Sequence, residues 1–191
     1  MSTPAFPPSP HHPRDLRSAR AGYRRLLAAD YARDQFLFER ITLAIFRAGQ
    51  ALRYVDTPVG RWLRRFVLVL DLAWTQALMG AELPHEVWAG PGLKLHHGGR
   101  GIILHPSVVI GENVRIYHNV TVGVRDGRPA ARIGDRAFLG TGATILGPVT
   151  IGADSKVGAH AVVLTDTEPG ATYVGVPAAP AAPAGTRATR P

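Results

Sequence analysis

Aliphatic residues recur every six positions through the second half of the chain. The recurring positions are Ile110, Ile116, Val122, Ile133, Leu139, Ile145, Ile151, Val157 and Val163. A small or β-branched residue follows four positions after all but one of them. An α-helix repeats near 3.6 residues and a strand near 2, so neither explains a period of six. The pattern indicates short strands joined by tight bends, in stacked coils that bury their aliphatic residues against one another.

Two insertions interrupt this period. The first adds three residues between Leu95 and Leu104, after an earlier in-phase set that begins at Leu83. The second adds five residues between Val122 and Ile133. With three periods per coil, this part of the chain holds about four coils, and insertions in a solenoid form surface loops that often line its binding face.

The first part of the chain has a different pattern. Residues 16–54 are good helix formers without proline, and a second helix is predicted over 61–79, after the break at Asp56-Thr57-Pro58. The predicted organisation is therefore mainly β, with a small α-helical region in front. Its parts are a disordered leader over 1–13, an α-helical oligomerisation region over 14–80, a solenoid domain over 81–177 and a flexible tail over 178–191.

Composition excludes several classes of site and partner. The 191 residues contain no cysteine, so disulfides, thiolate metal sites and a cysteine nucleophile are excluded. The net charge of +8 is almost wholly arginine, but no nucleic-acid-binding motif accompanies it, so we expect no nucleic-acid partner. The second helix has too few uncharged residues for a membrane span. No secretory signal opens the chain, and the cytoplasm is the expected compartment.

The densest polar feature is the His96-His97 pair, which lies at the first insertion beside two glycines. Glu82 precedes His97 by fifteen residues, close to the length of one coil. A carboxylate beside an imidazole keeps one ring nitrogen protonated and leaves the other free to accept a proton. Spacing alone also leaves a purely structural histidine open.

Three segments carry a resemblance to a known family. They are Gly80–Gly98 (GAELPHEVWAGPGLKLHHG), Ile110–Gly123 (IGENVRIYHNVTVG) and Val174–Pro177 (VGVP). The chain resembles the serine O-acetyltransferase branch of the hexapeptide-repeat acyltransferases over roughly residues 66–177. The resemblance implies a left-handed parallel β-helix and a homotrimer, or a dimer of trimers, with acetyl-CoA bound between neighbouring solenoids.

The resemblance also implies a catalytic pair and an acceptor site. His97 matches the family's catalytic histidine, and Glu82 matches its partner acid, which is usually an aspartate. His96 stands where the family usually has an aspartate that helps to bind serine. The family's loop reads the serine carboxylate through an Arg-His pair, and here Arg125 or Arg128 would replace that pair.

For the co-substrate, the resemblance implies coenzyme A contacts at Thr141, Ala159 and Thr165, largely through the backbone. Gly123 is the fourth expected cofactor-binding residue, and amide groups near it would face the developing oxyanion. Acetyl-CoA is the expected co-substrate, and we expect no metal. A related zinc-binding class would need a histidine at the position of Gly123 to pair with His118.

Three functional classes remain open. The first is O-acetyl transfer from acetyl-CoA to L-serine, as in cysteine biosynthesis, which the resemblance favours. The second is the same chemistry on a sugar or natural-product hydroxyl, because His96 and the loop depart from the family pattern. The third is a non-catalytic scaffold, which the presence of Glu82 and His97 disfavours. The chain ends in proline rather than the isoleucine that docks into cysteine synthase, so that complex is not expected.

Overall fold

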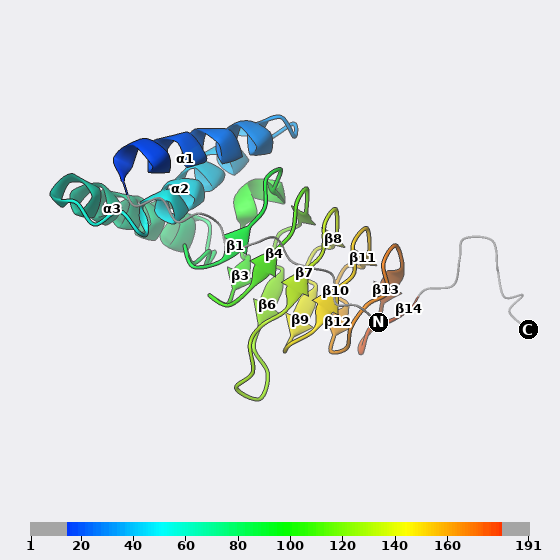
Figure 1. The fold of residues 1–191 in the computed structure, drawn as a ribbon. Coiled ribbons are helices and arrows are strands. Elements are labelled where there is room, and N and C mark those ends of the chain that lie inside the picture. Colours follow the sequence, from blue (N-terminus) through cyan, green and yellow to red (C-terminus); the bar gives the residue numbers. More distant parts are fainter. Residues whose placement is uncertain (1–14, 181–191) are drawn as a thin grey trace, which may run out of the picture.

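The computed structural model describes residues 15–180, and helices come first in the chain. They are α1 (Leu16–Tyr31), α2 (Leu37–Leu52) and α3 (Pro58–Leu70), which continues as a π-helix, η1 (Asp71–Leu78). Figure 1 shows them gathered beside the first coils of a solenoid. The leader predicted over residues 1–13 lies outside the described residues.

One helical prediction is wrong in its detail. The pattern over residues 16–54 is divided into α1 and α2, because the chain turns at residues 32–36 and Asp34 adopts a left-handed φ of 57°. A single left-handed residue ends an α-helix, and aspartate tolerates that conformation better than most residues. The Asp15 carboxylate caps α1 by accepting from the Ser18 amide, and the Thr57 hydroxyl caps α3 by accepting from the Gly60 amide.

Fourteen short strands follow within the described residues, and β1 to β13 build the predicted left-handed parallel β-helix of about four coils. The strands are β1 (Trp88–Ala89), β2 (Lys94–Leu95), β3 (Ile103–Leu104), β4 (Val109–Ile110), β5 (Arg115–Ile116), β6 (Thr121–Gly123), β7 (Arg132–Ile133), β8 (Phe138–Leu139), β9 (Thr144–Leu146), β10 (Thr150–Ile151), β11 (Lys156–Val157), β12 (Val162–Val163), β13 (Thr172–Val174) and β14 (Ala179–Pro180). They form three faces, in the orders β1-β4-β7-β10, β14-β13-β11-β8-β5-β2 and β12-β9-β6-β3. All pairs are parallel except that of β13 with β14. Strand β14 lies within the first residues of the predicted tail.

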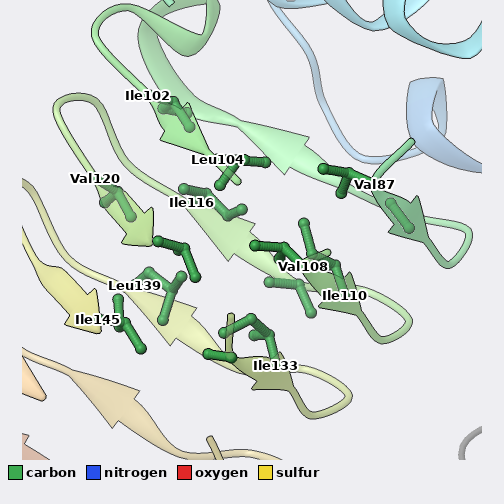
Figure 2. Packing of buried hydrophobic residues seen from close by; sticks show 14 of the residues in the cluster. Val87, Ile102, Leu104, Val108, Ile110, Ile116, Val120, Ile133, Leu139 and Ile145 are labelled. Carbon is green, nitrogen blue, oxygen red and sulfur yellow. The ribbon is translucent and has the colours of Figure 1, made fainter. Parts of the chain in front are cut away.

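The six-residue period corresponds to the dry interior of this prism. All nine recurring aliphatic residues have exposed fractions of 0 or 1%, and the strand registers stack Ile110 on Ile133 and Ile116 on Leu139. Figure 2 shows five of them, Ile110, Ile116, Ile133, Leu139 and Ile145, pointing inward from successive coils. The glycines that follow many of them let the coils approach closely, since a Cβ at Gly134 would lie 2.6 Å from the Ala153 nitrogen. The prediction of a stacked aliphatic core is therefore confirmed.

A buried ion pair fixes the helices to the first coils. Arg47 of α2 and Asp30 of α1 lie 2.7 Å apart with fully buried side chains. The Arg47 guanidinium also donates to the carbonyls of Ala89 and Gly90, and Asp30 accepts from the Leu93 amide. A buried charge pair needs such additional hydrogen bonds to offset its desolvation. No helix within the described residues is both long and apolar enough to cross a membrane.

The stacked core predicts how much stability is lost when one buried aliphatic side chain is shortened. Leu139→Ala should lower the free energy of unfolding by about 2–5 kcal/mol, because it opens a cavity that neighbouring coils cannot close. Lys156→Ala, on the outer side of the strand above, should change it by less than about 0.5 kcal/mol. Urea unfolding followed by circular dichroism measures both, and equal losses would contradict this description of the core.

Candidate functional site

The His96–Gly99 loop leaves the solenoid after β2, at the corner that leads to β3. Three consecutive residues of the loop have positive φ, at 57° for His97, 74° for Gly98 and 76° for Gly99. Only glycine adopts this conformation without strain, so the loop needs outside support at His97. A Cβ at Gly98 would lie 3.1 Å from atoms of Phe38 and Met79, which shows how closely the helices pack on the loop.

The His97 ring is exposed and lines a cavity of about 810 Å³. The cavity is lined by Phe36, Leu37, Phe38, Glu39, His96, His97, Gly98, Arg100 and His118. The His118 ring lies 4.8 Å from the His97 ring, nearly perpendicular to it, and its buried Nδ1 has no hydrogen-bond partner within residues 15–180. An exposed imidazole in a cavity of this kind can take a proton from a bound hydroxyl.

His96 lies on the same cavity in a different electrostatic state. Its ring stacks on Tyr117, with centroids 3.9 Å apart and planes inclined by 20°. Burial, followed by the positive charges of Lys94 and of neighbouring groups, lowers the pKa of His96 from 6.5 to about 4. The ring is therefore neutral at pH 7, where an aspartate at the same position would be negative.

The Glu82 side chain has no recorded contact with the rings of His96, His97 or His118 in the described part of the chain. Its side chain is exposed, and its backbone pairs with Ile103 at the start of the β3 face. In the part of the chain that the structure describes, the Glu82 carboxylate makes no hydrogen bond or ion pair. The carboxylate that contacts the histidine loop is that of Glu39, which accepts from the His97 amide at 3.1 Å.

Sequence reasoning missed Glu39 and His118. A signal for His118 was available, because it follows His97 by one coil of eighteen residues plus the three inserted ones, which places it in the corner directly beyond His97. The sequence offers no comparable signal for Glu39, because nothing in it shows where α2 docks.

The predicted coenzyme A residues divide between two edges of the prism. Thr141 and Ala159 occupy the same corner as His97 and His118, where the Gly142 amide donates to the His118 carbonyl. Gly123 and Thr165 lie at the far ends of β6 and β12, which is the opposite edge of that face.

The loop with Arg125 and Arg128 also leaves the solenoid at this second edge, just after β6. Its tight turn is held by a bridge between Arg125 and Arg128, and the Arg125 side chain lies 3.6 Å from the Asp126 carboxylate. A single chain therefore does not bring these arginines to His97. Among the described residues, no three His, Asp or Glu side chains gather closely enough to hold a metal ion.

The chain is similar to known proteins of one family. The family described as bacterial transferase hexapeptide (six repeats) matches residues 130–165. The serine acetyltransferase of Mycobacterium tuberculosis is 36% identical over 107 residues, which cover 54% of this chain and 46% of that protein. The chain spans about half the length of the curated relatives it matches.

Solved structures give a longer match. The soybean serine acetyltransferase apoenzyme is 30% identical with a TM-score of 0.68, and the match covers 86% of this chain and 69% of that one. A structure of the soybean enzyme complexed with serine is 29% identical with a TM-score of 0.67, covering 86% and 70%. The similarity therefore extends over the helices as well as the coils.

The lowered pKa of His96 predicts a pH-dependent stability. Below pH 6.5 the unfolded chain binds a proton at this residue, whereas the folded protein does so only near pH 4, so stability falls as the pH drops between these values. The melting temperature should fall by about 2–4 °C more than in His96→Gln between pH 6.5 and 4.5, which corresponds to ~1 kcal/mol after discounting for solvent screening of the ring. An equal fall in melting temperature for the two proteins would contradict the lowered pKa of His96.

Proposed function

The chain belongs to the hexapeptide-repeat acyltransferases, and we propose that it is an acetyl-CoA-dependent O-acetyltransferase that acts on the hydroxyl of L-serine. The observation that carries this proposal is the exposed imidazole of His97, which faces a cavity on the same solenoid edge as Thr141 and Ala159. The similarity to named serine acetyltransferases, one of them solved with serine, supports the acceptor.

In the proposed reaction, His97 acts as the general base. Its free ring nitrogen removes the hydroxyl proton while the serine oxygen attacks the thioester carbonyl carbon. The carbon–sulfur bond then breaks, the new ester keeps the acetyl group, and the imidazolium returns its proton to the coenzyme A thiolate. General base catalysis of this kind contributes about 10² to 10⁴-fold to the rate.

Glu82 is the proposed partner of His97. Its exposed carboxylate has no other hydrogen bond within the described residues, so its side chain is free to turn toward the ring when substrates fill the cleft. There it would orient the imidazole and stabilise the imidazolium, a role that changes the rate less than the base itself does.

We infer that the site is completed between protomers of a homotrimer. The arginine loop and Gly123 lie at the edge opposite His97 in one chain, and a three-fold arrangement brings this edge of one protomer to the His97 edge of the next. Arg125 and Arg128 would then face the serine carboxylate, and amides near Gly123 would face the oxyanion, a contribution of about 2.7–4 kcal/mol per donor in known cases. Acetyl-CoA would lie in the same cleft, against Thr141, Ala159 and Thr165.

The helical region offers a second interface. Along α3, the side chains of Trp62, Phe66 and Val69 are at least half exposed, and the rings of Trp62 and Phe66 stack 6.0 Å apart. Large apolar side chains gathered on an exposed helix face are typical of a protein–protein contact. It supports pairing of two trimers through these helices as the alternative assembly.

A second acceptor class has one observation in its favour. The neutral His96 ring, near Lys94 and Arg115, replaces the negative charge that would attract the ammonium group of serine. A sugar or natural-product hydroxyl without an ammonium group would not need that charge. Thiol release from acetyl-CoA, measured with serine and with a panel of sugars and amino alcohols, distinguishes the two. Serine-dependent release supports the first proposal, and release with sugars alone replaces it with the second.

The proposed roles of His97 and Glu82 predict that substitution of His97 lowers kcat more than substitution of Glu82. His97→Ala should lower kcat by about 10²- to 10⁴-fold with little change in the affinity for coenzyme A, because the ring acts in proton transfer rather than in cofactor binding. Glu82→Gln should lower kcat by less. Thiol-release kinetics and coenzyme A titration measure these effects. A His97→Ala protein with full activity would exclude His97 as the base.

A further inference from the structure

The first turn of α2 lies directly on the His97 loop. The Glu39 side chain is 2% exposed, although it carries a carboxylate. One of its oxygens accepts from the Phe36 amide at 3.0 Å, which caps the start of α2, and the other accepts from the His97 amide at 3.1 Å. The same carboxylate thus joins the end of a helix to the backbone of the proposed base.

Thr42 makes a second connection one turn along α2. Its hydroxyl donates to the Gly98 carbonyl at 2.7 Å and accepts from the Trp74 indole nitrogen at 3.0 Å. The loop is therefore held through an amide at His97 and a carbonyl at Gly98. Both contacts come from one face of α2, because residues three apart lie side by side on a helix.

This support falls where the loop is most strained. His97 is a residue with a full side chain in the left-handed region, at φ 57° and ψ 35°, and glycines follow it. Such a conformation persists only where the surroundings hold it in place. If His97 relaxed to an ordinary φ, its ring would leave the cavity that it shares with His118.

The chemistry of Glu39 also points to this role. No Lys or Arg forms an ion pair with it in the described part of the chain, so its buried charge relies on the two amide hydrogen bonds. A glutamine could cap α2 without the cost of burying a charge, but its amide group offers only one accepting oxygen. Accepting from the Phe36 and His97 amides through two separate oxygens, as Glu39 does, requires a carboxylate.

We propose that Glu39 and Thr42 are positioning residues for His97, so that α2 is part of the active site as well as a helix of the N-terminal region. They hold the left-handed backbone that directs the imidazole into the cavity. This inference rests on the proposed role of His97 as the base.

The test is a set of four variants assayed by thiol release, with the melting temperature of each recorded. Glu39→Gln keeps the size of the side chain and removes one acceptor, and Thr42→Val removes the donor to Gly98. Each should lower kcat by about 10- to 100-fold, the effect of misplacing a catalytic group by about 1 Å, while the KM for acetyl-CoA changes less than about twofold. Thr42→Val keeps the proposal testable if Glu39→Gln does not fold.

Gln50→Met is the matched control. Gln50 also lies on α2 and joins it to the solenoid, by donating to the Val87 carbonyl at 2.6 Å, but it makes no contact with the His97 loop. Its Oε1 also accepts from the buried Arg47 guanidinium at 3.0 Å. This variant should lower the melting temperature and leave kcat within about twofold of the wild type, because it loosens the docking of α2 at Val87 and Arg47 and leaves both contacts with the His97 loop in place.

The fourth variant combines Glu39→Gln with His97→Ala. If Glu39 acts through His97, Glu39→Gln lowers kcat in the wild-type protein but not in the His97→Ala protein, which has no imidazole to position. A general structural defect would lower kcat by the same factor in both proteins. Equal costs in both backgrounds, an unchanged kcat in Glu39→Gln and Thr42→Val, or an equal loss in Gln50→Met would each overturn the inference. Full activity in His97→Ala would instead overturn the proposed function itself.

Discussion

Hydrogen bonding from coil to coil is the constraint on which this structure depends. Its strands are two or three residues long, too short to form a core alone, and each strand inside a face is paired with its neighbours on both sides. The repeated register places like side chains above one another, so that Ile110, Ile133 and Ile151 form one column and Ile116, Leu139 and Val157 another. Stability comes from contacts between neighbouring coils, as in other repeat proteins, and the corners are left as regular edges.

These edges explain where the chemistry can lie. A corner residue can turn outward without disturbing the column behind it, and one corner carries His97, His118, Thr141 and Ala159 in successive coils. The first coil has no coil before it, and α2 takes that place. The contacts of α2 with the His97 loop support its left-handed backbone at His97 and the carbonyl of Gly98. Helices and coils therefore contribute to one site.

The solenoid was predictable because its signal is local. A six-residue period is readable from the sequence, and it gave the buried columns, the number of coils and the two surface insertions. The break between α1 and α2 was missed, because apolar spacing continues across the turn at residues 32–36, where Asp34 has a left-handed φ. Glu39 was missed for a different reason. It meets His97 fifty-eight residues later in the chain, through a docking of α2 that no spacing in the sequence reveals. The fifteen-residue spacing of Glu82 and His97 predicts that their backbones lie about one coil apart. It does not predict whether the two side chains point toward each other.

The proposed sharing of sites between the protomers of a homotrimer is tested most directly by hybrid trimers. Chains with His97→Ala and chains with Arg125→Ala and Arg128→Ala can be coexpressed with different tags and purified as mixed trimers. If one protomer supplies the imidazole and the next supplies the arginines, every mixed trimer contains one intact site of three and regains about a third of the wild-type rate. Mixed trimers as inactive as both parents would contradict the account.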